Sequence, residues 1–142
     1  MRFWDASALS PLIVTDVFTA RAEALMHQDE GMMVWWGSRV ECASSLARRE
    51  REGRLAAAES EASWRRLERM VVTWNEVAPN DDLRAESVRL LRRHSLRAAD
   101  ALQLAAAVLA AKTRPQPLDF VTFDERLADA AREEGFRIQG IR

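Results

Sequence analysis

The sequence predicts an α/β fold, an α/β/α sandwich in which a mostly parallel central sheet is flanked by helices. Two observations support this prediction. Short apolar runs typical of buried strands recur along the chain, and segments with helical spacing separate them. Strands that alternate with helices indicate a parallel sheet, because each helix returns the chain to the same edge. The 142 residues suit one domain, which we expect to span 1–142.

The N-terminal part of the chain contains two of the predicted strands and three predicted helices. Pro11 is expected to bend the first helix, Gly31 to end the second and Gly53 to end the third. The second helix is predicted to bury a face formed by Val17, Ala20, Ala24 and Leu25. The expected order is strand 1–4, helix 7–14, helix 16–28, strand 32–36 and helix 38–52.

The C-terminal part contains four predicted helices and a third clear strand. Pro79 ends an extended stretch, and Asn80 or Asp81 then caps a helix. Residues 114–117 ("RPQP") form a linker, and Gly135 ends the last helix. The expected order is helix 55–70, extended 71–77, helix 81–93, helix 96–111, strand 118–123, helix 124–134 and a possible edge strand 136–138.

Composition limits the classes of function. The net charge of −1 provides no overall positive field that would attract nucleic acid. Of 21 basic residues, Lys112 is the only lysine, a bias that genomic base composition can produce and that also suits phosphate recognition. Cys42 is the only cysteine, which excludes an internal disulfide and fits a reducing cytoplasm, where we expect the protein. The apolar run 98–111 is too short to cross a bilayer, so we expect no membrane span.

Four carboxylates occupy positions where a parallel sheet would bring them together. Asp5 directly follows the first strand, and Asp124 directly follows the strand 118–123. Glu41 lies in the first turn after the second strand, and Asp100 lies near the start of the apolar helix. Ligands bind beyond the carboxyl ends of the strands in such folds. Clustered acids repel one another, and Mg²⁺ or Mn²⁺ prefers oxygen ligands, so the pattern suggests a divalent cation site.

Each of these acids also has a purely structural interpretation. Asp5 and Asp124 stand where N-caps of the following helices would stand. "SRVE" at 38–41 matches a capping box in which Ser38 is the N-cap and Glu41 reaches back to its amide. Asp100 has the weakest alternative, because a carboxylate on a largely buried helix is costly without a partner and the helix dipole offsets only ~0.3–1 kcal/mol.

At these residues the chain resembles the PIN-domain ribonucleases, and within them the VapC toxins of bacterial toxin–antitoxin modules. Four stretches support the resemblance, in family order and spacing across nearly the full chain. They are "DASAL" (5–9), "SRVECASSLARR" (38–49), "LRAADALQLAAA" (96–107) and "FVTFDERLADAAREEG" (120–135). The resemblance implies a single PIN-like domain over 1–142 and a metal-dependent endoribonuclease that an antitoxin inhibits.

The resemblance also implies roles for particular residues. The four acids Asp5, Glu41, Asp100 and Asp124 would hold one or two Mg²⁺ or Mn²⁺ ions and carry the hydrolysis of RNA. Ser7 matches a hydroxyl that supports the first acid, and Thr122 matches the threonine of a "T-x-D" pattern. Ala6 departs from the family, in which many members carry Thr or Ser there. Asp119 and Glu125 are near enough to be confused with Asp124, but Asp124 matches best. The family further implies RNA as substrate, a cognate antitoxin and a homodimer.

Residues outside the four acids also have expected roles or positions. Arg48 lies seven residues after Glu41, hence on the same helix face, and is expected to contact RNA phosphate. His94 is expected on the surface. The tryptophans are expected in the core or at a dimer contact rather than as stacking platforms for bases; they are Trp4, Trp35, Trp36, Trp64 and Trp74.

Other classes of protein fit the sequence less well. The alternative function is a catalytically silent PIN-like module that binds RNA or a partner protein, but none of the four acids is missing. A phosphoacceptor receiver domain needs paired acids after the first strand, where Asp5 is followed by Ala6. A haloacid-dehalogenase-like phosphatase needs Asp two residues after the first, where Ser7 stands.

Overall fold

The computed structural model describes residues 1–141, and within them all sheet pairings are parallel. The sheet order is β3-β2-β1-β4-β5, so β1 lies at its centre with β2 on one side and β4 on the other. The strands are β1 (Arg2–Trp4), β2 (Met32–Trp35), β3 (Asn75–Val77), β4 (Asp119–Thr122) and β5 (Ile138–Gly140). The predicted parallel sheet is confirmed.

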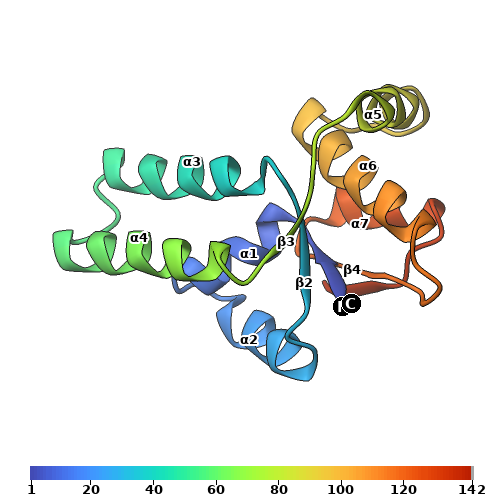
Figure 1. The fold of residues 1–142 in the computed structure, drawn as a ribbon. Helices are drawn as coiled ribbons and strands as arrows, with labels where there is room; N and C mark the ends of the chain where they lie inside the picture. Colours follow the sequence, from blue (N-terminus) through green and yellow to red (C-terminus); the bar gives the residue numbers. More distant parts are fainter. Residues whose placement is uncertain (142) are drawn as a thin grey trace.

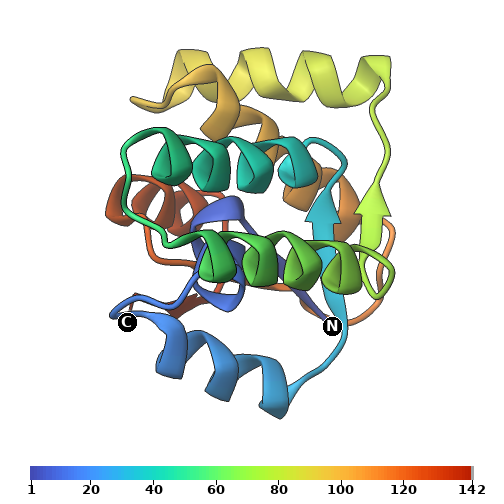
Figure 2. The same ribbon diagram turned by 90° about the vertical axis from the view of Figure 1, so that its left-hand side faces the viewer.

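Helices cover both faces of this sheet (Figure 1). The helices α1 to α4 lie on one side, where α3 and α4 run side by side (Figure 2), and α5 to α7 lie on the other. The helices are α1 (Ala6–Ile13), α2 (Thr19–Gln28), α3 (Ser38–Arg51), α4 (Ala57–Val71), α5 (Asp81–Arg93), α6 (Ala98–Lys112) and α7 (Glu125–Glu133). This arrangement is the α/β/α sandwich that the alternation of strands and helices predicts. No helix of residues 1–141 is long and apolar enough to cross a membrane.

Two hydrophobic clusters fix the layers to the sheet. Successive side chains of a strand point to opposite faces, so neighbours in β1 and β4 enter different clusters. Phe3 and Phe120 stack with ring centroids 5.3 Å apart in the cluster under α5 to α7. Trp4 and Val121 lie in the cluster under α1 to α4. Burying both faces of the central strands leaves only their ends to carry polar side chains.

The second helix begins later than its apolar pattern suggests. Residues 16–18 form a turn in which the Asp16 carboxylate accepts the backbone N–H of Phe18 at 2.8 Å, and α2 starts at Thr19. Val17 is consequently 89% exposed. Of the four residues of the predicted face, only Leu25 is buried. The prediction for this helix is therefore wrong in its start and in its face, because a side chain of the turn competes with the helix for backbone donors.

Smaller differences concern short edge elements. The extended stretch expected over 71–77 is reduced to β3, because α4 continues to Val71. The last strand lies at Ile138–Gly140, later than the expected 136–138. Edge strands pack on few neighbours, so their bounds depend on pairing partners more than on their own sequence.

Candidate functional site

The four predicted acids lie at the carboxyl edge of the sheet, three of them on the wall of one open pocket. The pocket has a volume of about 1030 Å³. Asp5 sits deeper, 3% exposed, where the charge of Asp124 acts on it. Arginines share the wall with the acids. The lining residues are Glu41, Arg48, Arg97, Ala99, Asp100, Asp124, Glu125, Arg126 and Asp129.

Asp5 is held from three sides by donors. The hydroxyl of Ser7 and the backbone N–H of Ala8 donate to Oδ1, at 2.8 and 3.1 Å, and the hydroxyl of Thr122 donates to Oδ2 at 3.2 Å. The pKa of Asp5 is raised to about 7, because burial and, to a smaller extent, the charge of Asp124 outweigh the hydrogen bonds that lower it. Asp5 is thus both the N-cap of α1 and a positioned carboxyl group that releases its proton near neutral pH.

Two hydroxyls tie the end of β4 to the end of β1. Thr122 Oγ1 accepts the backbone N–H of Asp124 at 3.0 Å and lies 3.2 Å from Ser7 Oγ. Ser7 Oγ accepts the backbone N–H of Phe123 at 3.0 Å. These contacts fix the turn between β4 and α7, which carries Asp124. The resemblance pairs Ser7 with the first acid, and in the structure both the Ser7 and the Thr122 hydroxyls donate to Asp5.

Glu41 is held by a side chain from the opposite layer. Nε2 of Gln103, on α6, donates to Glu41 Oε2 and to Ser38 Oγ, the latter at 3.0 Å. Burial raises the pKa of Glu41, the Gln103 bond lowers it, and the charge of Asp100 raises it. The capping-box interpretation is wrong, because Ser38 is the first residue of α3, Gly37 is the N-cap, and Ser38 is buried against Gln103.

Asp100 and Asp124 face the same pocket from α6 and α7. Burial raises the pKa of Asp100, and the charge of Asp124 adds to this rise. The backbone N–H and the charge of Arg97 lower it, as does the charge of Arg126. Asp124 caps α7, since its Oδ1 accepts the backbone N–H of Leu127 at 2.9 Å. Its capping role and its position in the pocket are compatible, because the cap occupies only one oxygen.

The donor set fits a hard divalent cation. The charge of Asp124 raises the pKa values of Asp5 and Asp100. The charge of Asp100 raises the pKa of Glu41. Such coupled carboxylates are the oxygen donors that Mg²⁺ and Mn²⁺ prefer. Over residues 1–141, however, no three Asp, Glu, His or Cys side chains are drawn into a group that could hold a metal ion as they stand. The residue types therefore fit a cation, but their side chains lie too far apart in this structure to form a complete coordination site.

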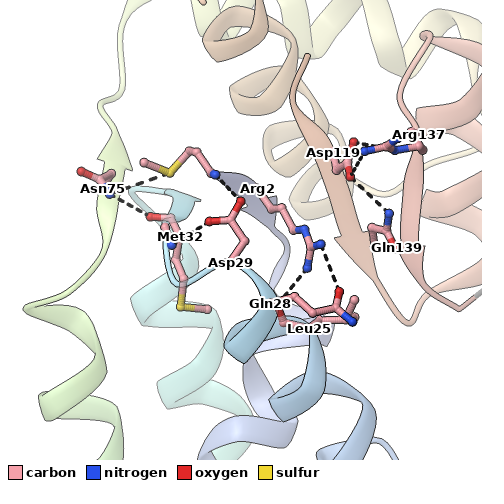
Figure 3. A network of polar contacts seen from close by, with 11 residues as sticks. Arg2, Leu25, Gln28, Asp29, Met32, Asn75, Asp119, Arg137 and Gln139 are labelled. Atoms are coloured by element: carbon pink, nitrogen blue, oxygen red, sulfur yellow. Dashed lines mark hydrogen bonds and ion pairs between the residues drawn. The ribbon is translucent and has the colours of Figure 1, made fainter. Parts of the chain in front are cut away.

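The other acids of the last motif differ in position. Asp119 lies at the opposite end of β4, where Arg137 Nε and Nη2 donate to its two oxygens at 2.9 and 2.8 Å (Figure 3). It closes the amino edge of the sheet and is remote from the pocket by topology. Glu125 does line the pocket, next to Asp124.

Several residues that contact the acids or line the pocket have no counterpart among the predicted sites. Gln103 was visible as the one amide in the apolar helix, three residues after Asp100 and hence on its face. Arg97 and Arg126 each lie close to a predicted acid in sequence, but helix phase alone does not say which arginines turn inward. Arg48, which was predicted, lies on the pocket wall with Glu41.

The structure tests the predicted exposure of His94 and of the tryptophans. The His94 side chain is 5% exposed, and its Nε2 lies 2.8 Å from Glu134, so the surface prediction is wrong. Glu134 holds the ring against the end of α7. Trp4, Trp35 and Trp74 are buried, as expected for core residues, whereas Trp36 is 54% exposed.

Comparison with known proteins agrees with this fold. The family model described as the PIN domain matches residues 2–133. The solved structure titled FitAcB from Neisseria gonorrhoeae superposes with a TM-score of 0.68 at 15% identity, over 98% of this chain and 96% of that chain. A comparison with curated proteins gives no match. The family match covers most of the chain, and the chain therefore belongs to the PIN domain family.

Proposed function

We propose that the chain is a Mg²⁺- or Mn²⁺-dependent endoribonuclease of the VapC toxin type. PIN domains are generally nucleases, and the observation that supports this particular activity is the placement of Asp5, Glu41, Asp100 and Asp124. They come from four different segments, and three of them have raised pKa values caused by burial and by one another's charge. Carboxylates packed against like charge in a pocket are stabilised by a cation.

The residues of this site would have three roles: binding the cation, positioning Asp5 and contacting RNA phosphates. Bound by these acids, a divalent cation would lower the pKa of a water and neutralise charge on the phosphoryl oxygens. Ser7 and Thr122 hold the two oxygens of the Asp5 carboxylate in place. Arg48, Arg97 and Arg126 offer planar donors to RNA phosphates on the same wall. Water as the attacking group would leave 3′-hydroxyl and 5′-phosphate ends.

The wider context of the toxin is part of the proposal. The resemblance to VapC toxins supports a cognate antitoxin that blocks the pocket, a homodimer and a cytoplasmic site of action. We also propose that 1–142 is one domain, because both hydrophobic clusters rest on the same sheet.

RNA cleavage tests the proposal. Wild type should cut single-stranded RNA with Mg²⁺ or Mn²⁺ and not with EDTA, and Asp100→Asn should lose the activity by 100-fold or more while remaining folded. Asp81→Asn is the matched control, because the Asp81 side chain is 96% exposed on α5 and lies outside the pocket. Cleavage that survives EDTA or Asp100→Asn would contradict the proposal. RNA binding with no cleavage under any metal would identify a silent PIN-like module instead.

A further inference from the structure

A second pocket adjoins the acidic pocket and shares two of its acids. Glu41 and Asp124 line both pockets, so an RNA strand lying across these two acids can reach into either pocket. The second pocket has a volume of about 410 Å³, within the range of about 300–1,000 Å³ typical of small-ligand sites. Its wall also includes Ser10, Asp16, Phe18, Ser45, Arg49 and Phe123.

The second pocket has aromatic rings on its wall, which the acidic pocket lacks. Phe18 and Phe123 stack with ring centroids 4.6 Å apart and planes 18° apart. The Phe18 residue is nevertheless 41% exposed, so stacking on Phe123 does not bury it. Phe123 directly precedes Asp124, which places this pair next to the acids.

The turn that presents Phe18 is fixed by hydrogen bonds. The Thr19 hydroxyl donates to the Pro11 carbonyl at 2.7 Å and accepts the backbone N–H of Asp16 at 2.9 Å. Asp16 Oδ1 accepts the backbone N–H of Phe18 at 2.8 Å. A ring held in place before binding loses little conformational entropy when a ligand stacks on it. An exposed ring on a fixed turn is thus suited to recognition.

Polar groups surround the rings. Ser10 and Ser45 line the pocket, and Asp16 Oδ2 lies 4.0 Å from Arg49 Nη2. Hydroxyl and carboxylate groups can accept hydrogen bonds from the amino groups of a nucleobase, and single-stranded RNA is read by stacking of this kind combined with edge contacts. A flat apolar ring with a few polar groups beside it matches a base better than it matches a phosphate.

We propose that this second pocket binds the base of a nucleotide next to the cleaved phosphate, with Phe18 as the stacking residue. The inference rests on the proposed function, since the acidic pocket would hold the phosphate whose neighbour this base is. The shared acids Glu41 and Asp124 set the two subsites side by side. Phe18 is in this account a determinant of RNA affinity and of cleavage position, with no part in the hydrolytic step.

A series of RNA oligonucleotides tests the subsite. Each carries one abasic nucleotide at a successive position around the bond that wild type cuts, or along the whole oligonucleotide if nothing is cut. Binding is measured by fluorescence anisotropy with Ca²⁺ in place of Mg²⁺, so that the readout does not depend on cleavage. At one position, loss of the base should weaken wild-type binding about 5- to 150-fold, the range for one base stacked on an aromatic side chain.

Variants of Phe18 then show whether this loss of RNA affinity depends on the Phe18 ring. Phe18→Leu should weaken binding of the intact RNA by a similar factor and should no longer respond to the abasic site, whereas Phe18→Tyr should behave as wild type. Val72→Ala, at an 83% exposed apolar residue after α4, is the control and should change neither. If Phe18→Leu does not fold, the abasic series on wild type and Phe18→Tyr still shows whether any single base is read.

The outcomes separate the two proposals. A protein that cuts RNA without an abasic effect, or with an equal effect in Phe18→Leu, overturns the subsite and leaves the nuclease intact; Phe18 would then serve a protein contact. A protein that never cuts but shows the Phe18-dependent effect supports the subsite and overturns the nuclease. A protein that binds no RNA overturns both.

Discussion

At the scale of single residues, Asp5 shows how one position serves structure and function together. Its carboxylate caps α1 and also accepts hydrogen bonds from the hydroxyls of Ser7 and Thr122. The sequence predicts the place of this acid, because an acid directly after a buried strand must lie at the strand's carboxyl end. It could not give the degree of burial, which depends on how α1 and the turn after β4 close over the side chain.

The raised pKa of Asp5 predicts how stability changes with pH in the metal-free protein. The pKa is about 7 in the folded state against 3.8 for the free side chain, so the folded state binds the proton more tightly. Between these values the unfolded chain has lost the proton and the folded protein retains it. The free energy of unfolding therefore falls as pH rises from about 4 to about 7, by roughly 4 kcal/mol.

The Asp5→Asn variant tests this dependence. An amide does not titrate, so urea unfolding in EDTA at pH 5, 6, 7 and 8 should show a shallower fall in stability for the variant than for wild type. Glu41 and Asp100, whose pKa values are also raised, keep some of the slope. Parallel pH profiles for the two proteins would mean that Asp5 titrates normally.

Arg48 is predicted to contact a phosphate through its position on the pocket wall. Arg48→Ala should weaken RNA binding and make the plot of log affinity against log salt shallower by about 0.7, the value for one contact to a single strand. Arg65→Ala is the matched control, since Arg65 lies on the surface of α4 and pairs with Glu61. Equal salt slopes for wild type and Arg48→Ala would exclude a phosphate contact.

At the scale of elements, α6 joins the two helical layers through one amide. Gln103 is buried, and its side chain reaches both Ser38 and Glu41 on α3. The sequence shows the residue but not the partner, because α3 and α6 are separated by about 50 residues and meet only through the fold. The same limit explains why the capping-box prediction at 38–41 is wrong. The side chains of Ser38 and Glu41 contact Gln103 on a distant helix instead of each other's backbone.

Changing Gln103 should therefore affect stability and the site separately. In Gln103→Met, Ser38 loses its partner, and the free energy of unfolding should fall by about 1–3 kcal/mol. Glu41 loses the donor that lowers its pKa, so Mn²⁺ affinity at pH 7 should fall several-fold. Urea unfolding in EDTA and isothermal titration with Mn²⁺ measure the two effects.

The double variant Ser38→Ala with Gln103→Met distinguishes the two roles. Removing both partners of a buried hydrogen bond can be nearly neutral, so stability should largely return. The affinity for Mn²⁺ should stay low, because Glu41 still lacks its donor. Recovery of both quantities would show that Gln103 acts only in packing.

At the scale of the whole molecule, the strand order explains why distant acids meet. β1 lies between β2 and β4, and all three run in the same direction, so their carboxyl ends share one edge. Alternation of strands and helices was enough to predict this edge and the three acids that follow strands. The start of α2 and the side-chain position of His94 were not predictable, because a turn side chain and an ion pair with Glu134 decide them.

The shape of the pocket follows from the two layers around this edge. Acids and arginines reach it from α3, α6 and α7, which belong to different layers. The second pocket lies between α1, α3 and the turn before α2, and it shares Glu41 and Asp124 with the acidic pocket. Exposed residues such as Phe18 cannot be assigned from their own sequence, since an apolar residue in a turn is equally compatible with the core.

Thermal unfolding with and without a divalent cation tests most directly that these acids form a cation site. In EDTA, Asp100→Asn should melt at or above the wild-type temperature, because one of the coupled charges is gone. Added Mg²⁺ should raise the melting temperature of wild type and of Asp81→Asn by the same amount, through binding to the folded state, and that of Asp100→Asn by much less. Equal Mg²⁺ responses in all three proteins, or none in wild type, would contradict the account.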